Sequence, residues 1–254
     1  MDLYEHPAAY ELAFSYRDIV GECDFLADVA RHSLGREAHS AVELAAGPAL
    51  HARCLAARGW SVVAVERSAG AVAWLRREAP EVVAIRADLR SFTLPEPVDV
   101  AFCPLSGFAY LLTDDDWRQA LDAAAAALVA GGLLVLELAP DDAERRTAER
   151  WTVTRDEVTV EAEAGPSVRV GADVFEWPLT LTLRAAGRTE RYTGLQRQRA
   201  VGAAHAERLV RGHPAFGAVR CHGGYDLTSR YRRGTLVLVA TRNDTAPGVP
   251  ADGL

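Results

Sequence analysis

The chain has 254 residues, a formal net charge of −7 and 28 basic residues, all of which are arginine. This acidic balance argues against nucleic acid as a partner, because neutralising phosphates requires a basic face. The absence of lysine excludes a P-loop lysine and a lysine that forms a Schiff base. The length suits one α/β domain with an insertion.

Cysteines and apolar segments indicate the compartment. The four cysteines form no C-x-x-C pair, so neither a zinc site nor a disulfide framework is expected. No apolar run approaches the roughly 18 residues of a transmembrane helix, and the N-terminus lacks the pattern of a signal peptide. We therefore expect a cytoplasmic protein that binds neither a membrane nor nucleic acid.

The first 35 residues favour helices and are rich in aromatic side chains. A helix that begins at Pro7 is predicted by its apolar spacing, and a second over residues 23–34 has an apolar stripe and ends at Gly35. Three tyrosines follow one another at intervals of six residues, namely Tyr4, Tyr10 and Tyr16.

A strand, a tight turn and a helix are predicted within residues 40–52. The apolar strand 41–44 carries one acid, Glu43, which must accept hydrogen bonds from backbone amides of the turn or from a ligand. The small residues 45–47 leave the backbone open to a ligand, and a helix that opens at Pro48 offers it free N–H groups. The sequence therefore predicts a ligand site at this turn.

Residues at the ends of neighbouring strands extend this site. Strands are predicted over residues 41–44, 61–65, 81–85 and 97–103. Glu66 ends the second strand nineteen residues after Gly47, and an acid at about this distance from a glycine turn binds a ribose diol. Asp88 and Pro104 follow the next two strands. Because open α/β sheets bind ligands at the carboxyl ends of their strands, we predict a nucleotide-like ligand here.

The glycine pattern argues against a nicotinamide-binding Rossmann domain. Its fingerprint has glycine at the first, third and sixth positions of the turn, where this chain has Ala45, Gly47 and Leu50. Leucine at the last of these positions would obstruct packing of the helix on the strand. The nicotinamide interpretation is therefore rejected.

The chain after residue 113 is expected to complete the sheet. The acids Asp114–Asp116 precede a predicted helix over residues 117–130, and we expect them to cap it and complement its dipole rather than bind a metal. A turn at Gly131-Gly132 leads into a strand over residues 133–138. In this strand Glu137 stands near the carboxyl end, where it either faces a ligand pocket or pairs with an arginine.

Alternating apolar and polar residues over 151–201 predict antiparallel strands that form a lid over the open sheet edge. Candidate pocket residues in this segment are Trp177, Arg197, Gln198 and Arg199. A helix over residues 203–210 and strands over 216–227 and 234–241 follow, and the tail 243–254 is expected to be disordered. Three residues are expected at the surface or in packing rather than in the site, namely His51, His222 and Tyr225.

Five motifs resemble, in order and spacing, those of class I S-adenosylmethionine (SAM) dependent methyltransferases. They are V-E-L-A-A-G-P-A, V-A-V-E-R-S, R-A-D-L, D-V-A-F-C-P-L-S-G-F-A-Y-L and G-G-L-L-V-L-E-L. They cover residues 36–140, and the chain most resembles the small-molecule group that includes glycine and amino-sugar N-methyltransferases. It departs from the family pattern at Ala45 and Ala49, where the family has glycine.

This resemblance implies an α/β fold, with a Rossmann-like doubly wound, mostly parallel seven-stranded sheet, a reversed C-terminal hairpin and an antiparallel β lid insertion. Five segments follow from it. They are a helical cap over the cofactor (1–35), a SAM-binding core (36–140), a lid with the acceptor site (141–202), a closing helix and hairpin (203–242) and a disordered tail (243–254).

The resemblance also implies the site residues. SAM, which leaves as S-adenosylhomocysteine (SAH), would contact Tyr16, Arg17, Glu43, Ala45, Gly47, Glu66, Arg67, Asp88, Leu89 and Pro104. Within this set Asp88 would accept from the adenine amine, unless it only caps a turn, and Arg17 would pair with the SAM carboxylate. The catalytic candidates that would face the acceptor are Tyr10, Tyr16 and Tyr110. No metal is expected.

The implied reaction is an in-line transfer of the methyl group to a nitrogen or oxygen of a small molecule, such as a natural product or an amino sugar. No histidine stands where a hydroxyl acceptor would need a base, which favours nitrogen. Two alternatives remain: an enzyme of this fold that uses SAM for another reaction, such as a cyclisation, or structurally, and a non-catalytic accessory or binding protein. We expect a monomer or a homodimer.

Overall fold

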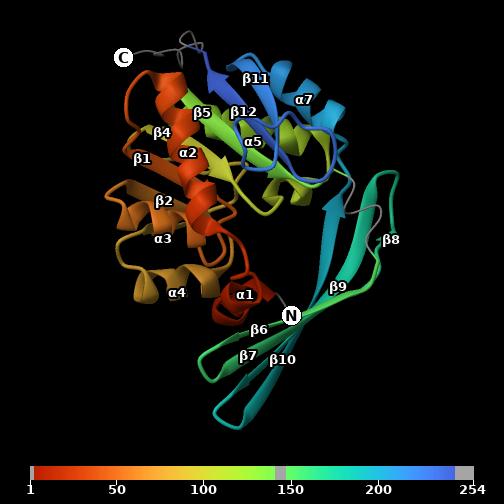
Figure 1. Ribbon diagram of the computed structural model, residues 1–254. Coiled ribbons are helices and arrows are strands. Elements are labelled where there is room, and N and C mark those ends of the chain that lie inside the picture. The colour runs from red at the N-terminus through yellow and green to blue at the C-terminus, as the bar shows by residue number, and fades with distance from the viewer. Residues whose placement is uncertain (1–2, 141–146, 244–254) are drawn as a thin grey trace, which may run out of the picture.

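The computed structural model describes residues 3–140 and 147–243, which form a core around one large sheet and a smaller second sheet (Figure 1). The large sheet, sheet A, has seven strands in the order β11-β12-β5-β4-β1-β2-β3. These are β1 (Ser40–Leu44), β2 (Ser61–Glu66), β3 (Val83–Arg86), β4 (Val98–Cys103), β5 (Leu128–Leu138), β11 (Phe216–Gly223) and β12 (Leu236–Arg242). Strands β1 to β5 are parallel, and β12 runs antiparallel between β5 and β11. This topology confirms the predicted fold class.

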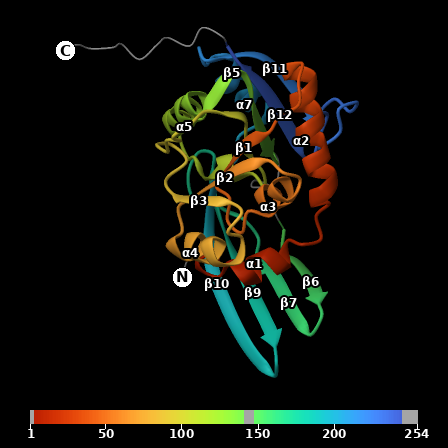
Figure 2. The ribbon, with the colours of Figure 1, turned by 90° about the vertical axis from the view of Figure 1, so that its left-hand side faces the viewer.

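Helices cover both faces of sheet A (Figure 2). They are α2 (Ile19–Leu34), α3 (Leu50–Ala57), α4 (Ala69–Glu78), α5 (Asp114–Ala127) and α7 (Ala203–Arg211). Because side chains alternate along a strand, Ala41 of β1 packs in the apolar cluster under α2, α3 and α4, whereas Val42 and Leu44 pack in the cluster under α5 and α7. The strand is thus held from both faces, which fixes the position of the turn at its carboxyl end.

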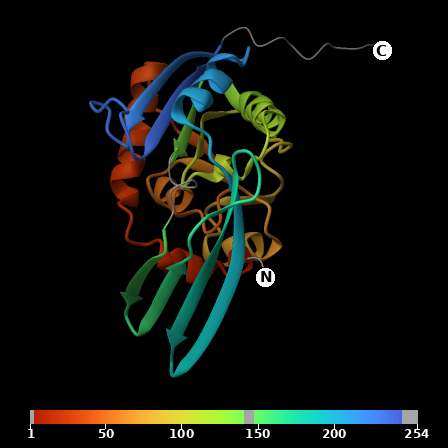
Figure 3. The ribbon, with the colours of Figure 1, turned by 90° about the vertical axis from the view of Figure 1, so that its right-hand side faces the viewer.

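The second sheet, sheet B, is antiparallel and projects from the same end of the core as α1 (Pro7–Ala13) (Figures 1 and 3). Its strands are β6 (Glu149–Arg155), β7 (Val158–Ala164), β8 (Val168–Arg169), β9 (Val174–Ala185) and β10 (Arg188–Arg199). One of its faces packs against α1 in a third apolar cluster that includes Leu12, Trp177 and Leu181. The antiparallel strands predicted between residues 151 and 201 are therefore present.

Two predicted boundaries around the site are wrong. Helix α3 begins at Leu50 rather than at Pro48, because Ala49 has a φ of 51° and so cannot belong to a right-handed helix. Strand β5 begins at Leu128, so the predicted Gly131-Gly132 turn lies inside it. There Gly131 has a φ of 73°, and the pairing with β4 shifts its register.

Other ends differ by a few residues. Helix α2 begins at Ile19 because Asp18 caps it, and α5 has Thr113 as its N-cap, so the three aspartates fill the first helical turn. Strand β11 ends at Gly223, before Gly224 with its φ of 69°. Residues 244–254 of the predicted tail lie outside the described residues. Within residues 3–140 and 147–243, no helix combines the length and the apolar character needed to span a membrane.

Candidate functional site

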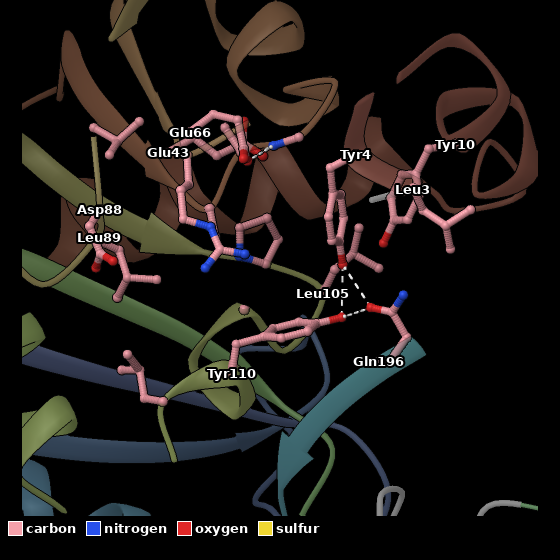
Figure 4. Close-up of a pocket in the computed structure, with 18 of the residues that line it drawn as sticks. Leu3, Tyr4, Tyr10, Glu43, Glu66, Asp88, Leu89, Leu105, Tyr110 and Gln196 are labelled. Atoms are coloured by element: carbon pink, nitrogen blue, oxygen red, sulfur yellow. Dashed lines mark hydrogen bonds between the residues drawn. The ribbon is translucent and has the colours of Figure 1, made fainter. Parts of the chain in front are cut away.

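A cavity of about 680 Å³ opens at the carboxyl ends of β1, β2 and β4. Its walls come from the turn after β1, the end of β2 and the segments 87–90 and 104–112 (Figure 4). The N-terminal residues Leu3 and Tyr4 and part of β10 also line it. Most of the predicted cofactor residues line this cavity, namely Glu43, Ala45, Gly47, Glu66, Arg67, Asp88, Leu89 and Pro104. Tyr16 and Arg17 do not.

The turn after β1 has an unusual backbone. Ala45, Gly47 and Ala49 have φ values of 53°, 52° and 51°, so every second residue is left-handed. An alanine pays about 1–2 kcal/mol for this conformation, whereas glycine adopts it freely. Backbone hydrogen bonds from Ala46 to Val65 and from Ala49 to Ala46 hold the turn in place. The two alanines thus adopt a backbone conformation that glycine favours.

Two buried glutamates bind backbone amides beside this turn. The Oε2 atom of Glu66 accepts from Gly47 N at 2.8 Å, and its Oε1 atom accepts from Ser68 N at 2.7 Å. Glu43 is 2% exposed and accepts from Ala52 N of helix α3 at 2.7 Å, so it binds the helix rather than the turn. These hydrogen bonds from backbone amides fix both carboxylates at the cavity wall.

Asp88 is bound by its neighbour in the chain. Its Oδ1 atom accepts from the backbone N and the Nε of Arg90, both at 2.9 Å, and its Oδ2 atom accepts from Nη2 at 2.8 Å. Hydrogen bonds from Arg90 hold the pKa of Asp88 below its usual range, so it is a carboxylate. The turn cap that the sequence allowed is present, and both side chains also line the cavity.

A second cavity of about 800 Å³ adjoins the first, between the core and sheet B. Tyr16 and Arg17 line this second cavity, as do the candidate pocket residues Trp177, Gln198 and Arg199, whereas Arg197 lines the first. Tyr16 is 66% exposed. Five residues line both cavities, namely Tyr4, Tyr10, Leu105, Tyr110 and Gln196.

A hydrogen-bonded group stands where the two cavities meet (Figure 4). The hydroxyls of Tyr4 and Tyr110 lie 2.7 Å apart, and Oε1 of Gln196 lies 3.4 Å from the first and 2.6 Å from the second. Because each hydroxyl has one hydrogen, Tyr110 donates to Gln196 and accepts from Tyr4. Burial raises the pKa of Tyr4 and of Tyr10, so both phenols are neutral. Sequence reasoning missed Tyr4 and Gln196 as site residues; the six-residue spacing of the tyrosines was the one available signal for Tyr4.

Arg17 forms a buried ion-pair network rather than facing the first cavity. It donates to both carboxylate oxygens of Glu137, at 2.9 Å and 2.7 Å, and to Glu22 at 2.6 Å. Glu137 also accepts from Leu105 N at 3.0 Å and from the Tyr225 hydroxyl at 2.9 Å. Of the two options for Glu137, the pairing with an arginine is present, and the side chain also lines the second cavity.

His222 and Tyr225 differ from the expectation of a surface position, because His222 is 9% exposed and Tyr225 binds Glu137. His51, for which a surface or helix-packing position is expected, is 1% exposed and pairs with Glu22 of the neighbouring helix α2, and it also lines the first cavity.

The acidic residues at the start of α5 are engaged by arginines. Asp114, Asp115 and Asp116 pair with Arg199, Arg118 and Arg90, respectively. In the described part of the chain, no three His, Cys, Asp or Glu side chains are grouped so that they could hold a metal ion.

Comparison with known proteins gives one family match. Residues 41–132 match the family described as "Methyltransferase domain". A dTDP-3-amino-3,6-dideoxy-alpha-D-glucopyranose N,N-dimethyltransferase from Streptomyces fradiae is 32% identical over 114 residues, 45% of this chain and 44% of the relative. A dTDP-4-amino-2,3,4,6-tetradeoxy-D-glucose N,N-dimethyltransferase from Saccharopolyspora spinosa is 32% identical over 135 residues, 52% of this chain and 54% of the relative. The matches thus span about half the length of these relatives.

Solved structures share the fold over nearly the whole chain. DesVI of Streptomyces venezuelae has a TM-score of 0.78 and 22% identity, over 92% of this chain and 97% of its own. CalS10, a SAM-bound amino pentose methyltransferase from Micromonospora echinaspora, has a TM-score of 0.72 and 23% identity, over 96% and 98%. The resemblance to class I methyltransferases predicted from the motifs is confirmed.

Proposed function

Because residues 41–132 match a methyltransferase domain within a chain of this fold, we propose that the protein transfers a methyl group from SAM to a nitrogen of an amino-sugar-like small molecule. The observation that carries this proposal is the pair of adjoining cavities with Tyr4, Tyr110 and Gln196 between them. One cavity would hold SAM and the other the acceptor.

The polar groups that line the first cavity fit the hydrogen-bonding groups of SAM. Each oxygen of Glu66 accepts one amide hydrogen, which leaves lone pairs for the two hydroxyls of a ribose. Asp88 and Leu89 provide an acceptor and an apolar surface for a base. When bound, SAM supplies a methyl group that is already activated by its sulfonium.

The residues at the junction would orient the acceptor. The side chains that both cavities share include three phenols and one amide but no carboxylate or imidazole. Because Tyr4 and Tyr10 stay neutral, we propose that the acceptor nitrogen binds as a free amine and that Tyr110 and Gln196 direct its lone pair. The surplus proton then leaves with the product.

Sheet B would act as the lid of the acceptor site. Its residues Trp177 and Gln198 line the second cavity, and Gln196 reaches the junction. Leu3 and Tyr4 would cover the SAM cavity from the N-terminal side. Both contributions would exclude water from the reacting atoms.

A nucleotide-linked amino sugar is the acceptor class that we favour. The two relatives are named for dTDP-linked amino sugars, which carry a diphosphate. Arg230, Arg232 and Arg233 line a hollow of about 630 Å³ together with Thr235, which also lines the second cavity. Guanidinium groups bind phosphate oxygens well, so this loop would hold the diphosphate.

Mass spectrometry of a reaction with SAM and a dTDP-linked amino sugar tests this function. The expected result is a sugar that has gained one or two methyl groups, with SAH formed in equal amount. If SAM binds and no acceptor is methylated, the use of SAM for another reaction is favoured. If neither SAM nor SAH binds, the protein is an accessory or binding protein.

We expect the substitution Tyr110→Phe to lower kcat by about fivefold, since the loss of one positioning hydrogen bond is worth about 1 kcal/mol. Affinity for SAH, measured by calorimetry, should change by less than about twofold. Tyr192→Phe is the matched control, because that hydroxyl binds the exposed Glu190 and lines neither cavity. An equal loss of SAH affinity in Tyr110→Phe would contradict the assigned role.

A further inference from the structure

A series of buried and partly buried charged side chains, the charge network, runs beneath both cavities. It begins with Glu43 at the end of β1 and continues through His51 of α3, Glu22 of α2 and Arg17 to Glu137 of β5. Glu43 and His51 line the first cavity, whereas Arg17 and Glu137 line the second. Carboxylates and cations alternate along the charge network, so the loss of one charge would alter the ion pairs of its neighbours in the network.

His51 links the Glu43 end of the charge network to the Arg17 end. Its Nε2 atom lies 2.6 Å from Oε2 of Glu22, and its Nδ1 atom lies 3.7 Å from Oε1 of Glu43. The same Oε2 atom of Glu22 accepts from Nη2 of Arg17 at 2.6 Å. The position of Arg17 therefore depends on where His51 holds Glu22.

The surroundings of His51 favour its charged form. Both ring nitrogens face carboxylates, and only an imidazolium has a hydrogen on each. Burial lowers the pKa of His51, but Glu22 and Glu43 outweigh burial and raise it to about 9. The other neighbours are Cys23, whose thiol donates to the His51 carbonyl, and the uncharged ring of Phe102. His51 is thus a cation at neutral pH.

We propose that protonated His51 is a positioning residue that couples the two cavities. It neutralises Glu43 at the end of β1, next to the turn at residues 45–49. It also holds Glu22 so that Arg17 keeps both of its contacts with Glu137. This role rests on the proposed function of the two cavities as SAM and acceptor sites.

Loss of the His51 proton would change the ion pairs at both ends of the charge network. Glu43 would then stand beside a neutral ring, and Arg17 would be the only cation shared by Glu22 and Glu137. The Nε of Arg17 is buried and has no hydrogen-bond partner among the described residues, so the hydrogen bonds of this guanidinium come from its two Nη atoms. Because the raised pKa means that the proton is lost as pH rises through about 9, ligand affinity should fall over that range.

Calorimetric titration with SAH from neutral pH to about pH 10 tests the coupling in wild type and in His51→Gln. We expect the variant to bind about tenfold more weakly at neutral pH and to approach wild type near pH 10, where wild type has lost the same charge. Because the amino group of SAH also titrates there, the tested quantity is the ratio of the two Kd values. The control is His213→Gln, a buried histidine that pairs with Asp122 and lines neither cavity.

A ratio of Kd values that does not change with pH would overturn the proposal. If wild type binds no SAH at all, the proposed function fails instead, and NMR titration of the imidazole ring then decides about His51 without a ligand or a variant. A midpoint near pH 9 supports the buried cation, and a midpoint below about pH 7 overturns it.

Discussion

Replacing Glu66 with alanine is expected to weaken SAH binding about 100-fold, because hydrogen bonds to a charged group are worth about 1.5–3 kcal/mol. Glu66 is 7% exposed, and its orientation is fixed by Gly47 N and Ser68 N. Isothermal calorimetry of wild type and variant measures the change. Unchanged affinity would mean that the ligand binds elsewhere.

Two further variants separate binding from folding. Glu66→Ala also leaves two amides without their acceptor, which should lower the free energy of unfolding by about 1–3 kcal/mol. Glu66→Gln keeps the volume and one acceptor but turns an NH2 group toward the other amide, so we expect intermediate losses of both affinity and stability. Glu78→Ala, at the exposed end of α4, should leave both quantities unchanged.

Replacing Arg17 with methionine is expected to lower the free energy of unfolding by about 3–5 kcal/mol, which is typical when one partner of a buried ion pair is removed. The side chain is 14% exposed, and within the described part of the chain its loss leaves Glu137 with only the Leu105 amide and the Tyr225 hydroxyl as donors. Denaturant unfolding followed by circular dichroism measures the effect.

The matched control for Arg17 is Arg31→Met. Arg31 also pairs with two acids, Asp28 and Glu37, but it is 50% exposed, so its removal should change the free energy of unfolding by less than about 1 kcal/mol. Similar effects of the two substitutions would show that the buried network contributes no more than a surface pair. In that case Arg17 would be held by the packing around it.

Patterns between residues close in the sequence were sufficient to predict the core and the residues that line the first cavity. Strand β1, its turn and α3 are consecutive in the chain, and the carboxyl edge of a parallel sheet brings Glu43, Glu66 and Asp88 to one place whatever the details of packing. Alternation of side chains also predicted the strands of sheet B. Their existence follows from the alternation of apolar and polar residues, which can be recognised in one sequence without an alignment.

The rest of the site depends on contacts between distant segments. Arg17 and Glu137 are 120 residues apart, and Tyr110 and Gln196 are 86 residues apart. A period of two does not say which end of β10 reaches the core, so Gln196 could not be distinguished from its neighbours. For His51, the first turn of a helix gave no sign that Glu22 of another helix would face it.

The left-handed turn has a consequence for recognising such chains. A search pattern that demands glycine at the first and last of these three positions passes over a sequence with Ala45 and Ala49, although the dihedral angles are those that glycine favours. A side chain at Gly107 would begin 3.0 Å from the Ala45 methyl group and 2.5 Å from Cys103 Sγ. A descriptor written in the signs of φ, together with glycine at position 107, would retrieve distant chains that a glycine count at the turn leaves out.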